Sequence, residues 1–150
     1  MLWLRLMSLG TLAAAAAIAG LTPGDVEIRF YDDRMEKIPY DEPTDAVAIS
    51  LETYTAKRVY QIASEYRKRN IPVIVGGFHA SLVPEEAERF AESVIVGEAE
   101  TIWPTVMDDL RHGTLKKRYQ GFERPLLEQI RPDRSIFRGK RYLPIGLVET

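Results

Sequence analysis

Short apolar runs that alternate with segments of helical periodicity constrain the fold of this chain more than any other feature. The most informative run, from Val73 to Ser81, reads Val-Ile-Val-Gly-Gly-Phe-His-Ala-Ser. Its β-branched residues are typical of a strand buried on both faces, and its two glycines permit either a simple tight turn or the close approach of a ligand. Similar runs predict three further strands, over Asp25–Tyr31, Asp45–Leu51 and Ser93–Val96.

Helical periodicity follows three of these strands. Apolar residues at three-and-four spacing predict a helix from Thr53 or Thr55 to about Asn70. Early proline and acidic residues predict a second helix over Pro84–Ala91, and a third, with Ile102 to Leu110 as its inner face, should end at Gly113. Strands and helices that alternate at these lengths predict an α/β fold, in which a parallel sheet with right-handed crossovers carries helices on both faces.

The first twenty residues allow two interpretations. Arg5 precedes an apolar run with small residues near Ala17 and Ala19, which is the pattern of a secretory signal peptide. The alternative is a buried helix from Ser8 to Ala19, with Ser8 as its N-cap and Gly20 as its stop. The run is too short for a comfortable membrane span, so we expect no membrane partner. We favour the buried helix over the signal peptide and therefore expect a cytoplasmic protein.

Composition excludes several functions. Twenty basic residues nearly balance twenty-two acidic ones, and the net charge of -2 gives no reason to expect nucleic acid as a partner. Without cysteine the chain can form no disulfide, no thiolate nucleophile and no cysteine-ligated zinc or iron-sulfur cluster. Its two histidines, His79 and His112, lack metal-ligand spacing, so we expect no metal site made by the protein.

The chain is long enough for one ordinary domain with a real core. We expect that domain to occupy residues 1–113, where the alternating pattern is found. Residues 114–150 contain scattered apolar residues and three prolines, which predicts an extended linker.

The predicted strand ends should share one rim, because parallel strands present their carboxyl ends at the same edge of a sheet. This rim would combine hydroxyls, carboxylates, free backbone amides and a histidine, which suits a large polar cofactor better than it suits hydrolysis. The sequence contains no recognisable Ser/His/Asp triad, P-loop or dinucleotide motif. The candidate cofactor-binding residues are Asp32, Ser50, Glu52, Thr53, Gly76, Gly77, Phe78, His79, Gly97 and Glu98.

Several of these residues have a simpler structural explanation. Asp32 and Asp33 can begin a turn without serving a ligand. His79 can cap a turn through a ring nitrogen. Trp103, on the last predicted helix, fits a core position better than a surface that stacks on a ligand.

Five segments, in this order and spacing, resemble the cobalamin-binding domain that precedes the catalytic barrel in one large class of radical S-adenosylmethionine enzymes. The resemblance implies a Rossmann-like or flavodoxin-like three-layer fold that holds cobalamin over the strand ends, with the nucleotide tail along the groove. The segments are Ser8–Ala14, Asp45–Ser50, Thr55–Ala63, Val75–Glu86 and Val96–Pro104.

By this resemblance, Ser50, Gly76 and Gly77 match the serine and the double glycine that lie near the tail in the family. Side chains at the glycines would obstruct a tail that lies against the backbone. The Asp-x-His-x-x-Gly motif, which supplies a histidine ligand to cobalt in some cobalamin proteins, is absent. The resemblance therefore implies cobalamin binding without a lower histidine ligand from that motif.

The resemblance also implies a larger parent enzyme, in many relatives a methyltransferase. Pro132-Asp-Arg and Tyr142-Leu-Pro resemble the family's linker, and Val148–Thr150 resembles the strand that leads into the barrel. The three-cysteine motif for the four-iron cluster would follow Thr150. We therefore expect no catalytic residue in this chain, a downstream radical S-adenosylmethionine domain as its partner, and the cluster and S-adenosylmethionine in the parent protein alone.

One departure concerns the amino terminus, because the family places a strand and a loop before the helix expected at Ser8. Either Leu2–Leu6 form this strand with a very short loop, or the central strand is missing. A missing strand would leave unpaired sheet edges, which could support dimerisation.

Two alternative functions follow from these observations. The first is a ligand-free structural or protein-interaction domain of the same fold. The second is a receiver-like signalling domain, which Asp32 and Asp33 suggest. A receiver would need a phosphorylatable aspartate at the next strand end, where this chain has Ser50.

Overall fold

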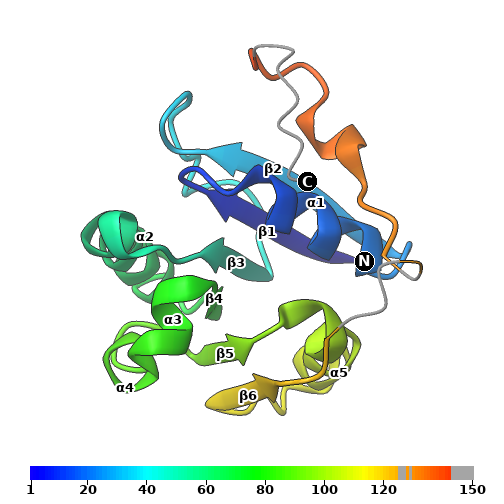
Figure 1. Ribbon diagram of the computed structural model, residues 1–150. Coiled ribbons are helices and arrows are strands. Elements are labelled where there is room, and N and C mark those ends of the chain that lie inside the picture. The colour runs from blue at the N-terminus through cyan, green and yellow to red at the C-terminus, as the bar shows by residue number, and fades with distance from the viewer. Residues whose placement is uncertain (125–127, 129, 143–150) are drawn as a thin grey trace.

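Six parallel strands form one sheet in the computed structural model, which describes residues 1–124, 128 and 130–142 (Figure 1). The strand order is β2-β1-β3-β4-β5-β6, so the direction of winding reverses between β1 and β3. In open α/β sheets such a reversal creates a crevice at the carboxyl ends of the strands. The strands are β1 (Leu2–Ser8), β2 (Val26–Asp32), β3 (Ala46–Ser50), β4 (Val73–Gly76), β5 (Ser93–Gly97) and β6 (Arg118–Gly121).

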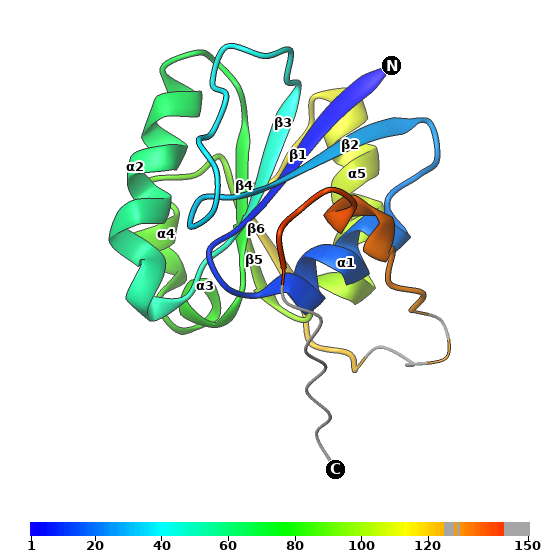
Figure 2. The ribbon, with the colours of Figure 1, turned by 90° about the horizontal axis from the view of Figure 1, so that it is seen from above.

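Helices cover both faces of the sheet, as Figure 2 shows. On one side lie α1 (Leu12–Leu21) and α5 (Ala99–His112), and on the other lie α2 (Ala56–Arg67), α3 (Phe78–Leu82) and α4 (Pro84–Ala87). Single 3-10 turns occur at η1 (Thr53–Thr55) and η3 (Arg134–Phe137). This arrangement confirms the predicted three-layer α/β fold with a parallel sheet.

Alternate residues of the central strands fill the two halves of the core. Val73 and Val75 of β4 pack in the half that contains α2, whereas Ile74 packs in the half that contains α1 and α5. Strands buried on both faces need apolar residues at successive positions, which is why their sequences form continuous β-branched runs. Trp103 of α5 is 1% exposed and belongs to the second half, as expected for a core residue.

The amino terminus resolves the two alternatives for the first strand. β1 lies between β2 and β3, with Ser8 in register with Asp32 and Leu6 in register with Ala48, so the central strand is present. The expected helix start at Ser8 is wrong, because α1 begins at Leu12. Ser8 instead ends the strand, and its hydroxyl accepts hydrogen bonds from the amides of the loop that follows.

The segment that resembles a signal peptide therefore forms the central strand and the first helix of the domain. An incomplete sheet is no longer a reason to expect association through its edges. Of the helices in the described part of the chain, none has the length and apolar character needed to cross a membrane.

The predicted helices are largely confirmed, with changes at their ends. α5 ends where expected, and Gly113 caps it in the left-handed conformation at φ 68°. The helix expected over Pro84–Ala91 is shorter, and the additional helix α3 precedes it directly after the double glycine. α3 was missed because Phe78–Leu82 is too short to show helical periodicity.

The linker interpretation of residues 114–150 missed strand β6. β6 pairs with β5 from Arg118 to Gly121 and extends the sheet beyond the last predicted helix. A four-residue strand with Tyr119 as its single large apolar side chain gives little periodic signal. The strand expected at Val148–Thr150, together with Leu143 and Pro144, lies outside the described residues.

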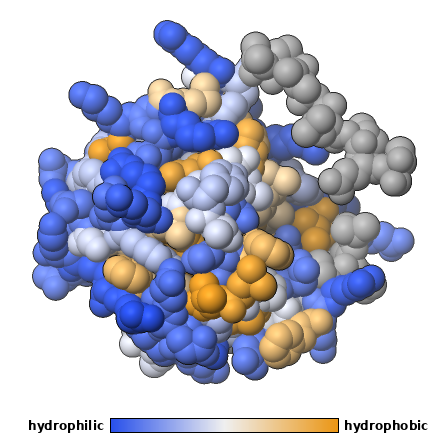
Figure 3. Space-filling view, turned by 60° about the vertical axis from the view of Figure 1, so that its left-hand side comes forward, coloured by the Kyte–Doolittle hydropathy of each residue, from blue (hydrophilic) through white to orange (hydrophobic). Residues whose placement is uncertain are grey.

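Large apolar side chains are exposed on parts of the surface. On the face shown in Figure 3, such side chains gather in the lower middle among hydrophilic ones. Tyr54 and Phe78, which follow β3 and β4, are 78% and 64% exposed. Exposed aromatic side chains thus occur beside the carboxyl ends of the central strands.

Candidate functional site

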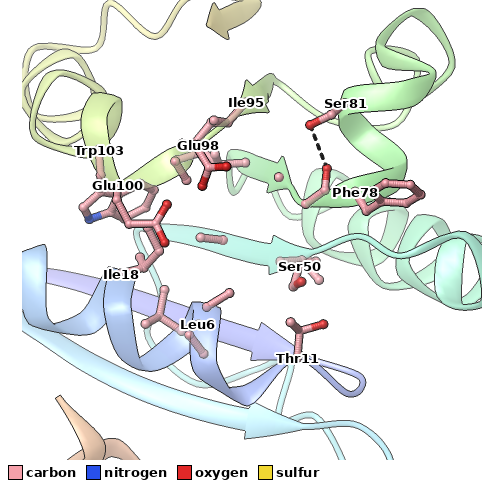
Figure 4. Close-up of a pocket in the computed structure, with 18 of the residues that line it drawn as sticks. Leu6, Thr11, Ile18, Ser50, Phe78, Ser81, Ile95, Glu98, Glu100 and Trp103 are labelled. Atoms are coloured by element: carbon pink, nitrogen blue, oxygen red, sulfur yellow. Dashed lines mark hydrogen bonds between the residues drawn. The ribbon is translucent and has the colours of Figure 1, made fainter. Parts of the chain in front are cut away.

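A pocket of about 480 Å³ lies between α1, α5 and the carboxyl halves of the central strands (Figure 4). Apolar side chains of the strands form its floor: Leu6 is in register with Ala48, and Ala48 with Ile74. The next residues along β3 and β4 on the same side of the sheet are Ser50 and Gly76. The pocket therefore changes from apolar at its floor to polar at the strand ends.

Small side chains on α1 leave room for this pocket. Ala14, Ala15 and Ile18 line it from the helix, and two of the three carry a single methyl group. On the opposite side, Trp103 of α5 lines the pocket while its indole N–H donates to Thr22 Oγ1 at 3.0 Å. The indole donor is thus satisfied within the protein, and Trp103 offers an apolar surface to the pocket.

Carboxylates and hydroxyls surround the polar part of the pocket. Figure 4 shows Glu98 and Glu100 with their carboxylates directed toward the pocket. Thr11, at the amino end of α1, donates from Oγ1 to Glu52 Oε1 at 3.4 Å. Ser81 Oγ donates to the Gly77 carbonyl at 3.0 Å and accepts from the Gly97 amide at 2.9 Å, which ties the ends of β4 and β5 together.

The two glycines of the pair Gly76-Gly77 differ in whether the backbone requires glycine at that position. A Cβ at Gly76 would have Ile95 Cβ as its nearest neighbour at 3.5 Å, an ordinary contact, so the protein itself does not require glycine there. Gly77 has φ +116°, and a Cβ would lie 2.9 Å from the Leu51 carbonyl oxygen. Gly77 is therefore required by the backbone, whereas the missing side chain of Gly76 leaves space in the pocket.

The pocket brings together seven of the ten candidate residues. They come from the ends of β3, β4 and β5 and the turns that follow. Three candidates, Asp32, Thr53 and His79, do not line it. The seven are Ser50, Glu52, Gly76, Gly77, Phe78, Gly97 and Glu98.

His79 lies in a hydrogen-bonded cluster beside the rim. Its Nδ1 is 3.1 Å from Thr53 Oγ1 and its Nε2 is 3.2 Å from Glu86 Oε1, to which Tyr60 also donates at 2.9 Å. The hydrogen bonds from His79 and Tyr60 hold the pKa of Glu86 below its usual value. Both ring nitrogens thus have partners within the protein, in agreement with a structural role at a turn.

Asp32 is fully buried at the end of the edge strand β2. It accepts hydrogen bonds from the Arg34 amide at 3.1 Å, from Arg34 Nε and Nη2 at 3.0 and 2.7 Å, and from the Tyr142 hydroxyl at 2.9 Å. Burial acts to raise the pKa of Asp32, but these bonds outweigh it and the pKa lies below its ordinary value. Asp33 pairs separately with Arg58 at 2.6 Å.

Most of the residues that form the apolar surface of the pocket were not predicted from the sequence, because the candidates were chosen among the residues at the strand ends. The signals were present in the alternation along each strand and in the alanine-rich stretch of α1. Across the described part of the chain, no group of three or more acidic or histidine side chains could hold a metal ion. The missed pocket residues include Ala14, Ala15, Ile18, Ala48, Ile74, Ile95 and Trp103.

A parallel three-layer fold with a pocket at the carboxyl ends of its strands places the chain among the α/β domains in which that edge of the sheet is the usual place for a ligand. Residues 7–106 match the B12 binding domain family, and the chain belongs to that family. This finding confirms the resemblance that the sequence motifs indicated.

Two similar proteins are known from Chlorobaculum tepidum. Bacteriochlorophyllide d C-8(2)-methyltransferase is 40% identical over 120 residues, and bacteriochlorophyllide d C-12(1)-methyltransferase is 31% identical over 122 residues. Each match covers 79% of this chain and 27% of the relative. The chain thus spans about a quarter of the length of these curated relatives.

Proposed function

We propose that this chain is a cobalamin-binding module whose pocket receives the nucleotide tail. The observation that carries the proposal is the space at Gly76, where the missing side chain opens the pocket between β3, β5 and the two helices. The membership of the B12 binding domain family supports the same ligand.

The pocket fits the chemistry of that ligand. Its volume of about 480 Å³ lies in the usual range for small-molecule sites. The floor of Leu6, Ala48 and Ile74 suits the flat apolar faces of an aromatic base. Nearer the strand ends, Ser50 and Glu98 offer oxygen atoms to ribose hydroxyls and to the amide groups of the corrin ring.

The protein residues bind and orient the cofactor in this proposal. Bound cobalamin supplies a cobalt centre that can carry a methyl group. Ser50 and Gly76 hold the tail against the strand ends, and α1 and α5 exclude water from its base. We assign no cobalt ligand to His79, because Thr53 and Glu86 already occupy both of its ring nitrogens.

We also propose that the module serves a larger radical S-adenosylmethionine methyltransferase. The two methyltransferase relatives support methyl transfer, and the share of their length that this chain spans supports further domains in the parent. The four-iron cluster and S-adenosylmethionine would be bound outside residues 1–150, because the chain contains no cysteine. The downstream domain would be the partner of the module.

Retention of cobalamin tests the proposed ligand. The purified chain is mixed with hydroxocobalamin, desalted and scanned for the visible absorption spectrum of the cofactor, while circular dichroism verifies the fold. We expect the spectrum to remain with the protein in a one-to-one ratio. Complete loss of colour from the folded protein would contradict cobalamin binding by this chain.

A further inference from the structure

The last described segment of the chain folds back along the outside of the domain. We call residues 131–142 the strap. The Asp133 amide donates to the Ala16 carbonyl of α1 at 2.8 Å, and the Phe137 ring meets Phe30 of β2 edge-to-face with centroids 5.1 Å apart. Figure 2 shows this orange-to-red segment beside α1 and β2. The strap therefore contacts both a helix that lines the pocket and the edge strand.

The strap packs closely against Gly20, near the end of α1. A Cβ at this position would collide with the Arg131 carbonyl oxygen, so the absence of a side chain lets the strap approach the end of α1. A fitted contact of this kind indicates that the strap has a defined seat on the domain.

The far end of the strap is held by two charged groups near the carboxyl edge of β2. The Tyr142 hydroxyl donates to Asp32 Oδ2 at 2.9 Å. Lys140 Nζ contacts Glu36 Oε1 at 2.5 Å, and that same oxygen accepts from the Asp32 amide at 3.2 Å. Asp32 therefore joins the strap to the turn that follows β2.

Asp32 also lies beside the end of β1, where the loop that borders the pocket begins. Asp32 is in register with Ser8, whose hydroxyl accepts from the amides of Gly10 at 3.1 Å and Thr11 at 2.8 Å. Arg34 is held by both oxygens of Asp32, and its Nη1 lies beside Gly10, 3.9 Å from the position that a Cβ would take there; the Tyr54 hydroxyl is nearer to that position, at 2.6 Å. Thr11 lines the pocket, so Asp32 and Arg34 lie between the strap and the loop that reaches the pocket.

We propose that Asp32, Arg34 and Tyr142 form a latch that couples the seating of the strap to the order of the loop 9–11 at the pocket. When Tyr142 is bound, Asp32 is saturated with donors and Arg34 is fixed beside Gly10. When Tyr142 leaves, the buried carboxylate loses a donor and gains access to water, and Arg34 is less restrained. The latch makes Asp32 a positioning residue for the pocket, although it does not line it.

Coupling of this kind is reciprocal. If the seated strap orders the loop that a ligand contacts, the ligand must favour the seated strap by the same factor. The expected effect of cobalamin on the strap rests on the proposed cobalamin binding. The expected coupling between the strap and residues 9–11 in the free protein does not.

Hydrogen-deuterium exchange of the full chain tests the latch, with Tyr142→Phe as the variant. This change removes the hydroxyl that reaches Asp32 and keeps the ring, which packs on Phe137 with centroids 5.8 Å apart. Tyr119→Phe is the matched control, because it also removes a hydroxyl bonded to an aspartate, Asp109 at 2.6 Å, but does so on the opposite edge strand.

We expect Tyr142→Phe to speed exchange about tenfold in both the strap and residues 9–11, as loss of one charge-assisted hydrogen bond predicts. Tyr119→Phe should change neither segment. In the wild type, hydroxocobalamin should slow exchange in the strap, and Tyr142→Phe should weaken its retention.

Faster exchange in the strap with no change in residues 9–11 would overturn the coupling, as would unchanged exchange in the strap itself. If the wild type retains no cobalamin, the proposed ligand fails, and the exchange of the free protein still decides the latch. If cobalamin binds equally well to the wild type and to Tyr142→Phe, the coupling to the ligand is overturned while the proposed function stands.

Discussion

Ser50 on β3 and Gly76 on β4 are partners in register, and both line the pocket between the sheet and the helices α1 and α5. One position supplies a hydroxyl and its neighbour supplies free space. A nucleotide tail needs both, because a base requires room and a ribose requires hydrogen-bond partners. This pair therefore provides the most direct tests of the site.

Gly76→Val should abolish cobalamin retention without unfolding the domain. A Cβ at Gly76 meets ordinary contacts, so the two added methyl groups would extend into the pocket. Steric overlap with the tail should lower the affinity at least about tenfold, so that little or no cobalamin absorption remains with the protein after desalting. Gly24→Val is the control, because a Cβ at Gly24 has no neighbour within 4 Å. Equal retention by both variants would remove Gly76 from the site.

Alanine at the two adjacent glycines should have opposite effects on stability. Gly76→Ala should leave the free energy of unfolding unchanged or raise it by up to about 1 kcal/mol, because alanine restricts the unfolded chain. Gly77→Ala should lower it by about 1–3 kcal/mol, since φ is +116° and the Cβ would press on the Leu51 carbonyl. Urea denaturation followed by circular dichroism measures both. Similar values for the two variants would contradict the separate roles assigned to them.

Trp103→Ala should be strongly destabilising. The side chain is almost fully buried, and its indole N–H is bonded to Thr22. Loss of a buried tryptophan lowers the free energy of unfolding by about 3–5 kcal/mol in proteins generally. Trp3→Ala is the comparison within the same chain, because Trp3 is partly exposed at the start of β1. Urea denaturation should show a smaller loss of free energy of unfolding for Trp3→Ala than for Trp103→Ala. A larger loss for Trp3→Ala would argue against a packed core at Trp103.

Asp32 should make the stability of the domain depend on pH in the acidic range. Its folded pKa lies below the unfolded value of about 3.9. Its contribution is therefore fully present well above that value and is lost as the pH falls through the folded pKa. Asp32→Asn should lower the free energy of unfolding by about 1–3 kcal/mol at pH 7, and the difference from the wild type should shrink below about pH 4.

Urea denaturation between pH 3 and about 7 measures this dependence. Asp41→Asn serves as the control, because that carboxylate is 96% exposed and should contribute little at any pH. If the difference in free energy of unfolding between the wild type and Asp32→Asn stays constant over the whole pH range, the charge of Asp32 does not stabilise the fold.

Long periodic segments determined most of the fold from the sequence. The strands around Val47 and Val75 and the helices α2 and α5 carry enough apolar residues to show their period, and their alternation specified a parallel sheet. The two ends of the chain were harder to interpret. The alanine-rich segment after β1 made that strand hard to recognise, and β6, which pairs with β5, has a single large apolar side chain and so shows no period.

The candidate site was predicted in part for a related reason. Ser50, Gly76 and Glu98 could be placed at one rim, because parallel strands align their ends. The apolar floor depends on which face each residue presents, and the space above it depends on small side chains of α1 at a distance in the sequence. Local patterns carry no information about such distant neighbours.

The sequence by itself determined that strands end in glycines and hydroxyls at one edge, because strand direction and period are local properties. Tertiary structure alone decided which of those ends share a pocket. Asp32 ends an edge strand and is enclosed by Arg34 and Tyr142, whereas Gly76 ends a central strand between two helices. Their different roles arise from burial and from partners far along the chain, which only the packed fold brings together.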